Sequence, residues 1–301
     1  MQKLPLVTII TPSFNQGRFI EETILSVLHQ DYPHIEYIIM DGGSTDQTLD
    51  ILLKYSNRLA WYSEKDNGQT HAINKGLRLA NGEILAYLNS DDTYLPGAIT
   101  RAVRYLTVEN PDLPLVYGEG YHISAEGSII ERYPTEPFDF RHLAETCFIC
   151  QPTTFWKRDV IEKVGLLDEN LHYAMDYDYW IRVAKHYGTL GYLNEYLANS
   201  RFYEETKTMS KRFEVHKEIL NVIRNHYGKG NIPSTWIYAY AHYFMDRLVS
   251  RQTRSKNVFF MLGMTIIAAL KFLQYNHTIP ISEFKRWKEW YVDGLFYHRG
   301  S

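Results

Sequence analysis

Short apolar runs alternate with stretches of helical spacing along the N-terminal part of the chain. Four runs rich in β-branched or aromatic residues are predicted strands, at residues 6–11, 35–40, 59–62 and 84–88. Between them, apolar residues recur every three to four positions over predicted helices at residues 20–28, 49–53 and 73–80. Ser44 and Gln47 have capping-box spacing before the second helix. The repeat of strand, loop and helix predicts a parallel, doubly wound α/β sheet with helices on both faces.

Polar side chains follow each of the four predicted strands. In chain order they are Ser13 with Asn15, then Asp41, then Asp66, then Asp91 with Asp92. Ligands bind beyond the carboxyl ends of strands in an open α/β sheet, so we expect these side chains to face one crevice. The alternative is that each aspartate only caps a turn or helix, and we prefer that interpretation for Asp46.

Two adjacent carboxylates, Asp91 and Asp92, stand directly after the fourth run. Hard oxygen ligands at this place suit Mg²⁺ or Mn²⁺, and through the metal a diphosphate. No G-x-G-x-x-G follows the first strand and no Walker lysine motif is present, so the dinucleotide and P-loop classes are excluded. A nucleotide would be held in another way.

The middle of the chain predicts the remaining part of a mixed sheet. A helix is expected near residues 98–106, with strands at residues 115–118 and 128–130. Residues 175–182 read as the start of another helix, with Asp176 and Asp178 in its first turn. Taken alone, both carboxylates could simply complement the helix dipole.

Composition narrows the function classes. The chain has 301 residues, 45% of them hydrophobic, and a formal net charge of −3, which argues against nucleic acid as the main partner. Its two cysteines, Cys147 and Cys150, have C-x-x-C spacing but no second pair to complete a zinc site, so we expect reduced thiols. Residues 1–5 lead straight into a strand, so we expect no signal peptide and a reducing compartment.

The N-terminal block resembles the nucleotide-binding half of family 2 glycosyltransferases with the GT-A fold, a mixed and mainly parallel Rossmann-like sheet. The motifs that carry this resemblance are residues 11–15, 41–46, 63–68 and 89–92. The resemblance implies that Thr11, Asp41 and Asp66 contact the base and ribose of a nucleotide-sugar. It also makes Asp91 the last carboxylate of a D-x-D metal motif.

Two positions depart from the family pattern. Asn89 replaces the first aspartate of D-x-D, and Gly42 follows Asp41 where a second aspartate is usual. Asn89 can still hydrogen-bond a ribose but adds no charge. With Ser13 and Asn15 at the first strand end, Asn89 completes the residues we expect around the nucleotide, and Asp92 is expected beside Asp91 at the metal.

The resemblance also assigns a role to the helix that begins near residue 175. Asp176 aligns with the carboxylate that acts as general base, with Met175 where glutamate is common. An acceptor hydroxyl must lose a proton as it attacks an anomeric carbon, so a carboxylate is needed here. Asp178 is expected to orient Asp176 or bind acceptor, and Arg182 to brace the site. In the loop at residues 201–208, which resembles one that closes over the donor, Lys207 or Arg201 would offset diphosphate charge, unless the loop is simply solvated.

From residue 211 the composition changes to helical and aromatic-rich. We therefore predict a glycosyltransferase domain at residues 1–210 and a helical extension at residues 211–301. The apolar run at residues 258–270 is too short for an ordinary membrane span. Two interpretations stay open for it, a protein contact such as homo-oligomer formation or an interfacial membrane helix.

The sequence thus predicts an inverting glycosyltransferase that uses a divalent cation and a nucleoside-diphosphate sugar, with UDP-sugars favoured by the resemblance. The acceptor would be a saccharide or lipid-linked saccharide in bacterial cell-surface polysaccharide synthesis, in the cytoplasm or at the inner face of its membrane. The alternatives are a non-catalytic nucleotide-sugar-binding module and a nucleotidyltransferase. Donor turnover distinguishes the first alternative, and release of pyrophosphate the second.

Overall fold

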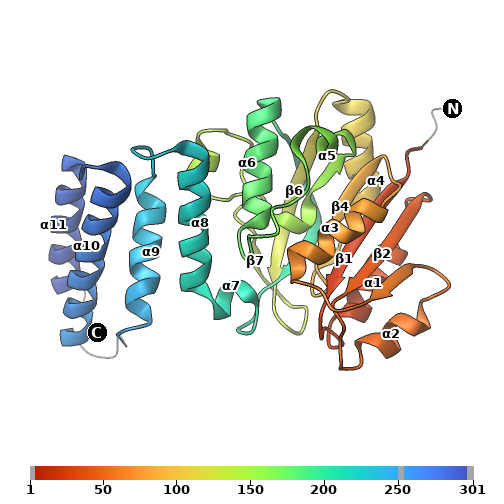
Figure 1. Cartoon of the computed structure of the whole chain (residues 1–301), viewed down its shortest axis with the longest axis horizontal. Helices are drawn as coiled ribbons and strands as arrows, with labels where there is room; N and C mark the ends of the chain where they lie inside the picture. Colours follow the sequence, from red (N-terminus) through yellow and green to blue (C-terminus); the bar gives the residue numbers. More distant parts are fainter. Residues whose placement is uncertain (1–3, 250–253, 297–301) are drawn as a thin grey trace. The chain divides into compact units, whose positions relative to one another are not determined.

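A computed structural model describes residues 4–249 and 254–296 of the chain. The chain divides into two compact units, which we describe separately. The first contains residues 1–143 and 147–206, and the second contains residues 144–146 and 207–301. The first unit holds the whole sheet and the second is built of helices (Figure 1).

One nine-stranded sheet forms the centre of the first unit, in the order β3-β2-β1-β4-β8-β6-β9-β5, with β7 paired to β6. Its strands are β1 Val7–Ser13, β2 Ile35–Asp41, β3 Ala60–Ser63, β4 Ile84–Tyr87, β5 Thr93–Tyr94, β6 Leu115–Ile123, β7 Ile129–Arg132, β8 Phe155–Lys157 and β9 Gly191–Arg201. Strands β1 to β4 are parallel, and β8 joins them to β6 through antiparallel pairs on both sides. The prediction of a mixed, mainly parallel GT-A-type sheet is confirmed.

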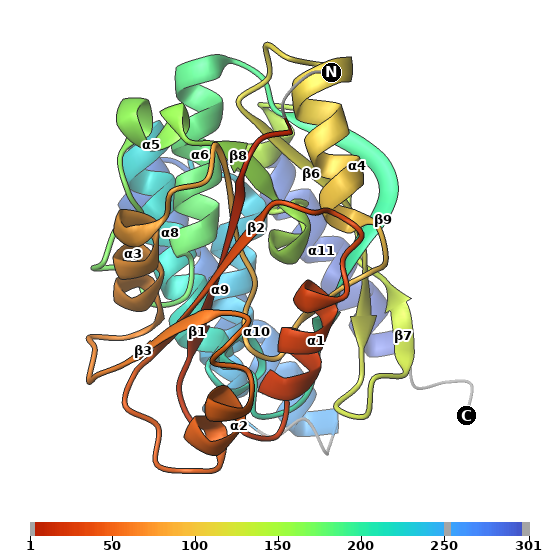
Figure 2. The same cartoon turned by 90° about the vertical axis from the view of Figure 1, so that its right-hand side faces the viewer.

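Helices cover both faces of this sheet (Figure 2). They are α1 Ile20–Leu28, α2 Thr48–Lys54, α3 Gln69–Leu79, α4 Ala98–Arg104, α5 Asp159–Val164 and α6 Met175–Tyr187. On one face, α1 and α4 bury apolar side chains against residues such as Val7, Ile9 and Ile84. On the other, α3 lies so close to β1 that a Cβ at Gly76 would come within 2.6 Å of Ile10. A glycine is required there because any side chain would push the helix off the sheet.

Aromatic packing fixes α6 on the same face as α3. The rings of Tyr87 on β4 and Trp156 on β8 pack edge to face, with their centroids 6.2 Å apart. The Trp156 ring packs in the same way against Tyr179 and Trp180 of α6, with centroid distances of 5.9 Å each. All four side chains are almost fully buried. Such aromatic pairs prefer edge-to-face geometry, so they set the orientation of α6 and of its first turn.

The structure also departs from the sequence prediction in places. Strands β5, β8 and β9 were not expected. The capping box at Ser44 is wrong, because helix α2 begins at Thr48 and Ser44 instead bonds to Asp41. The preferred interpretation of Asp46 holds, since its carboxylate accepts from the backbone N–H of Thr48 at 3.0 Å and of Gly17 at 2.9 Å.

The second unit consists of helices that lie side by side (Figure 1). They are α7 Lys207–Ser210, α8 Arg212–Tyr227, α9 Ser234–Asp246, α10 Arg254–Asn276 and α11 Ile281–Phe296. Helix α9 packs between α8 and α10 and buries Trp236, Ile237, Ala241 and Met245. The indole N–H of Trp236 donates to the carbonyl of Ala144 at 2.8 Å, which ties residues 144–146 to this unit.

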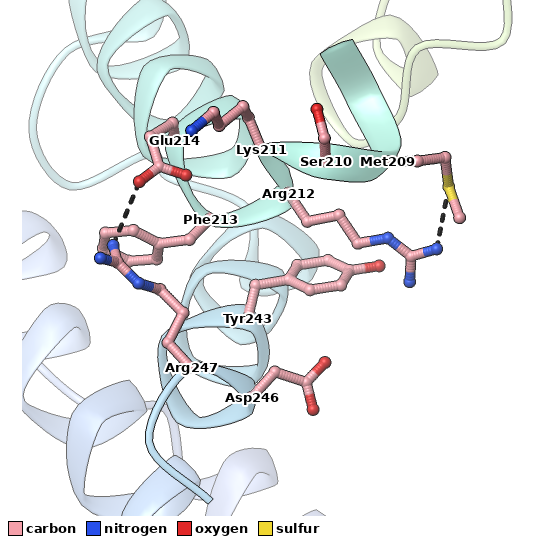
Figure 3. A pocket seen from close by; sticks show the side chains of 9 residues that line it. All are labelled: Met209, Ser210, Lys211, Arg212, Phe213, Glu214, Tyr243, Asp246 and Arg247. Carbon is pink, nitrogen blue, oxygen red and sulfur yellow. Dashed lines mark hydrogen bonds and ion pairs between the residues drawn. The ribbon is translucent and has the colours of Figure 1, made fainter. Parts of the chain in front are cut away.

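A pocket of about 290 Å³ lies within the second unit, beside α7 and the start of α8 (Figure 3). The guanidinium groups of its two arginines are already engaged. The guanidinium of Arg247 pairs with Glu214 at 3.1 Å, and that of Arg212 lies over the ring of Tyr243 at 5.7 Å. The pocket contains no residue that the sequence assigned to a functional site.

Candidate functional site

The ends of β1 and β2 lie side by side and form the first part of the site. In the sheet register Ser13 is opposite Asp41. The Asp41 carboxylate is buried and accepts from the hydroxyls of Ser44 at 2.5 Å and Ser63 at 2.6 Å, and from two backbone N–H groups. Thr11 is fully buried, and its hydroxyl meets that of Tyr37 at 3.1 Å. Asp41 and Thr11 are therefore buried residues that hold the ends of β1 and β2 in place through their hydrogen bonds.

Two further predicted residues differ in what they do at this edge. Asn15 holds two loops together, because its side-chain oxygen accepts from Thr45 N–H at 2.8 Å and its own N–H donates to Ser44 at 2.7 Å. This needs a left-handed backbone, with φ of 52° at Asn15, which asparagine tolerates. The buried Ser13 hydroxyl has no hydrogen-bond partner within the described part of the chain. A polar atom left in this state fits a site completed by a ligand.

Asp66 lies against the end of β2, next to Gly42. A Cβ at Gly42 would stand 2.8 Å from Oδ2 of Asp66. The other carboxylate oxygen of Asp66 accepts from Gly68 N–H at 2.8 Å. Gly42 therefore leaves the space that the Asp66 carboxylate fills, which explains the absence of a second aspartate after Asp41. Asp41 and Asp66 come together as predicted.

Asn89 is the centre of a polar network at the end of β4. Its amide nitrogen donates to Asp92 and to Gln151, each at 3.1 Å, and its oxygen accepts from Gln69 at 2.7 Å. Gln151 in turn donates to the carbonyl of Tyr87 at 2.9 Å. The network needs a side chain that both donates and accepts, so asparagine suits this position where aspartate would not.

Replacing Asn89 by aspartate is expected to destabilise the protein by about 1–3 kcal/mol at pH 7 without divalent ions, because Asp92 loses a donor and gains a like charge. Repulsion raises the folded-state pKa of the new pair, so the loss is present at neutral pH and shrinks as the pH falls. Urea unfolding at pH 7 and pH 5 measures this difference. An Asn89→Asp variant as stable as the parent at both values would contradict the role of the network.

The adjacent carboxylates Asp91 and Asp92 have different surroundings. Asp92 is buried, and its two oxygens accept from Arg201 N–H at 2.8 Å and from Asn89 at 3.1 Å. Burial, and after it the charge of Asp91, raise the pKa of Asp92 well above its usual value, while the two donors oppose the shift. Asp91 is only half-buried and accepts from the hydroxyl of Tyr203 at 3.0 Å. Asp92 thus braces the turn that presents Asp91.

Arg201, 110 residues further along the chain than Asp91, fixes this turn. Its side chain is 1% exposed and donates to the carbonyl of Asp91 at 2.8 Å, to the carbonyls of Ser124 and Ala125, and to Glu22 at 2.6 Å. A buried guanidinium with all these acceptors is a structural cation, so the expectation that Arg201 offsets diphosphate charge is wrong. Lys207 begins α7 in the second unit and is not among the residues that the first unit brings together.

Tyr203 is a site residue whose role the sequence did not reveal. Its ring packs 5.1 Å from that of Phe19, and burial, followed by the Asp91 charge, raises the pKa of its hydroxyl. The hydroxyl therefore remains protonated and donates to Asp91.

Asp176 stands in the first turn of α6 and belongs to the same region. Burial mainly raises the pKa of Tyr87, and the next two causes are the charges of Asp176 and Asp92. The same two carboxylates contribute to the raised pKa of Tyr133, after burial and the two cysteines. The start of α6 and the end of β4 therefore share one electrostatic environment.

Helix α3 holds the loop that leads into α6. The Thr70 hydroxyl donates to the carbonyl of Leu171 at 2.8 Å, and the side chain of Asn74 exchanges hydrogen bonds with the backbone of Leu167 at 2.9 and 3.1 Å. At the start of the same helix, directly before Thr70, Gln69 reaches Asn89. One helix thus positions both the β4 turn and the segment before Asp176. Arg182 bonds to Asp178 at 2.8 Å and braces this segment as expected.

A metal ion at this site would depend on a ligand for part of its coordination. In residues 4–249 and 254–296, no group of three or more His, Cys, Asp or Glu side chains could hold a metal ion. One accessible carboxylate, Asp91, with substrate phosphates completing the shell is a normal arrangement for Mg²⁺. The crowding of negative charge at Asp91 and Asp92 fits a cation at this edge.

Comparison with known proteins shows the family. The profile of "Glycosyl transferase family 2" matches residues 8–165, which is more than half of the chain. The chain belongs to glycosyl transferase family 2. The match covers all of the parallel strands with polar ends, and the prediction of family and enzyme class is confirmed.

Family 2 relatives include named bacterial proteins. The chain is 31% identical over 218 residues to an uncharacterized glycosyltransferase of Rickettsia typhi, an alignment that covers 68% of this chain and 66% of the relative. It is 30% identical to the putative teichuronic acid biosynthesis glycosyltransferase TuaG of Bacillus subtilis, over 71% of this chain and 88% of TuaG. The chain spans between 33% and 70% of the length of five Rickettsia relatives.

Solved structures of similar fold carry nucleotide-sugars. S. aureus TarS 1–349 in complex with UDP-GlcNAc has a TM-score of 0.59 at 18% identity, with 96% of this chain and 92% of TarS covered. The mannosyltransferase PcManGT of Pyrobaculum calidifontis, in complex with GDP-Man and Mn²⁺, has the same TM-score and identity, with coverages of 99% and 89%. At this identity the likeness establishes the GT-A type of fold.

Proposed function

We propose that the chain transfers a sugar from a nucleoside-diphosphate sugar to a hydroxyl acceptor with inversion. The observation that carries the proposal is the convergence of polar strand ends at one sheet edge, where Ser13 lies opposite Asp41 and Asp66 lies against Gly42. Base and ribose would lie along the ends of β1 to β3, against Ser13 and Asp66. Thr11, Asp41 and Asn15 would hold these loops in place, and Asn89 would do the same for the β4 turn.

The diphosphate would lie at Asp91, the more accessible of the paired carboxylates. A bound Mg²⁺ or Mn²⁺ would neutralise charge on the leaving diphosphate, with Asp91 as its protein ligand. Asp92 would act through Asp91, since both of its oxygens bond within the protein. The Mn²⁺ in the PcManGT complex supports a role for a divalent ion.

Asp176 would accept the proton of the acceptor hydroxyl as that oxygen attacks the anomeric carbon. The bond from this carbon to the diphosphate breaks in the same displacement, and the nucleoside diphosphate leaves. A single displacement inverts the anomeric centre. Tyr87 cannot take the proton, because burial raises its pKa and keeps it neutral.

The donor we favour is a UDP-sugar, and the acceptor a saccharide or lipid-linked saccharide in polysaccharide synthesis. The UDP-GlcNAc complex of TarS and the teichuronic acid assignment of TuaG support this substrate class. The sugar transfer would then take place in the cytoplasm, where nucleotide-sugars are made.

A thermal-shift screen of nucleotide-sugars tests the proposal. A donor at a hundred times its dissociation constant is expected to raise the melting temperature by roughly 5 °C, and by less without Mn²⁺. Incubation with an acceptor should then release nucleoside diphosphate. Binding without release would instead indicate a non-catalytic module, and release of pyrophosphate would indicate a nucleotidyltransferase.

A further inference from the structure

Helix α10 exposes an apolar stripe along its length. Phe259, Leu262, Ile266, Leu270 and Leu273 recur at spacings of three and four residues and are 49–61% exposed. This spacing places them on one face of the helix. The segment Val258–Asn276 has a mean hydropathy of 1.7, and only 22% of it is buried. By length and composition alone it is long and apolar enough to cross a membrane, which corrects the expectation that this stretch is too short. Most of this apolar segment is thus not covered by any other residue that the structure describes.

The opposite face of α10 packs within its own unit. Phe260, Ala268, Phe272 and Tyr275 are buried there. The rings of Phe272 and of Tyr238 on α9 pack with their centroids 5.7 Å apart. A Cβ at Gly263 would overlap Met245, which also belongs to α9. A helix that packs on one side within its own unit is suited to lie along a surface, not to cross a bilayer alone.

Helix α11 exposes a face on which lysines accompany apolar side chains. Ile281 is 88% and Phe284 54% exposed, and Lys285 and Lys288 follow them at helical spacing, both exposed. Trp287 and Glu283 are buried on the other side. Lysine stems can lie along an apolar surface while the ammonium groups reach anionic head groups.

Charge is divided unevenly along the chain. Residues 251–301 contain eight lysines and arginines and three acidic residues, a formal charge of +5, whereas residues 1–250 carry −8. Basic residues near an anionic lipid surface each add attraction. A pairing of two copies through these helices would bring two positively charged surfaces together, which disfavours a second copy as the partner.

We propose that the exposed faces of α10 and α11 bind the surface of an anionic lipid bilayer, with the apolar stripe in the interface and the lysines at the head groups. This surface is distinct from the sheet edge where we place the donor. The inference does not rest on the proposed reaction. It commits to lipid because apolar exposure and positive charge occur on the same pair of helices.

Vesicle co-sedimentation of the full chain tests this proposal. We expect binding to vesicles of phosphatidylcholine with one third phosphatidylglycerol, and little binding to phosphatidylcholine alone. Leu262→Gln with Ile266→Gln should reduce partitioning at least ~tenfold, because two apolar side chains no longer enter the interface. Lys285→Glu with Lys288→Glu should reduce it by more than ~25-fold, at roughly fivefold for each lost lysine.

Matched variants in the first unit control for general effects. Leu53→Gln changes a leucine that is 61% exposed on α2. Lys54→Glu on α2 with Lys163→Glu on α5 changes the net charge by the same amount as the α11 variant does. Both are expected to bind as the parent does. Circular dichroism should show equal helix content and melting temperature for all variants.

Three results would overturn the proposal. One is the absence of binding to either vesicle, and another is unchanged binding of the α10 variant. The third is a dimer, seen by light scattering without lipid, that the α10 variant converts to monomer, since a second copy would then cover the stripe.

Discussion

Asp176→Asn is expected to lower the rate of sugar transfer at least ~100-fold while the donor still binds with the affinity of the parent. The carboxylate stands at the start of α6 in the shared environment of Tyr87, and an amide of the same size cannot accept the acceptor's proton. We place the donor contacts at the strand ends, so they should survive the change. Steady-state release of nucleoside diphosphate gives the rate, and calorimetry gives the affinity.

The matched control is Asp159→Asn, which removes a first-turn aspartate from α5 in the same unit. It removes the same kind of favourable interaction with a helix N-terminus, worth about 0.3–1 kcal/mol. We expect it to leave turnover unchanged. If Asp176→Asn also kept full turnover, Asp176 would have no part in the reaction.

Asp91→Ala is expected to eliminate the part of nucleotide binding that depends on a divalent ion. Asp91 is the accessible carboxylate of its pair, and loss of a direct ligand should exceed the ~10–100-fold cost of losing an outer-shell partner. Calorimetric titration of the nucleoside diphosphate, with Mn²⁺ and with a chelator, measures both components. Equal Mn²⁺ dependence in parent and variant would place the ion elsewhere.

Tyr203→Phe provides the control for Asp91. It removes the hydroxyl that donates to Asp91 at 3.0 Å but keeps the ring beside Phe19. Divalent-dependent binding should persist in this variant, because the carboxylate remains. Asp92→Asn differs from both variants, because Asp92 is buried and accepts hydrogen bonds from Arg201 and Asn89. This change should therefore lower the melting temperature.

The sequence allowed the parallel half of the sheet to be predicted, because strands β1 to β4 are short runs rich in apolar residues, and polar residues follow each of them. Strand β9 was missed for a physical reason. Asn194 and Glu195 interrupt its apolar pattern, and its pairing with β6 shifts register near that point. Strand β5 has two residues, too few to show any period.

The aspartates of the site were predictable by type and position, but their individual roles were not. Asp91 and Asp92 are identical neighbours in the sequence. Asp92 turns inward because the N–H of Arg201 reaches it from 109 residues further along the chain. Likewise, Gly42 could be interpreted only once the structure placed Asp66 against it. Such long-range partners leave no local signal.

Helix α3 has a consequence for engineering. Its contacts with the β4 turn and with the loop before α6 come from Gln69, Thr70 and Asn74, which span about 7.5 Å at 1.5 Å per residue. A helical segment that short hardly bends, so it fixes the spacing between the β4 turn and the loop that leads into α6. Loops around this segment can be exchanged in a search for new acceptors, provided that Gln69, Thr70 and Asn74 are kept.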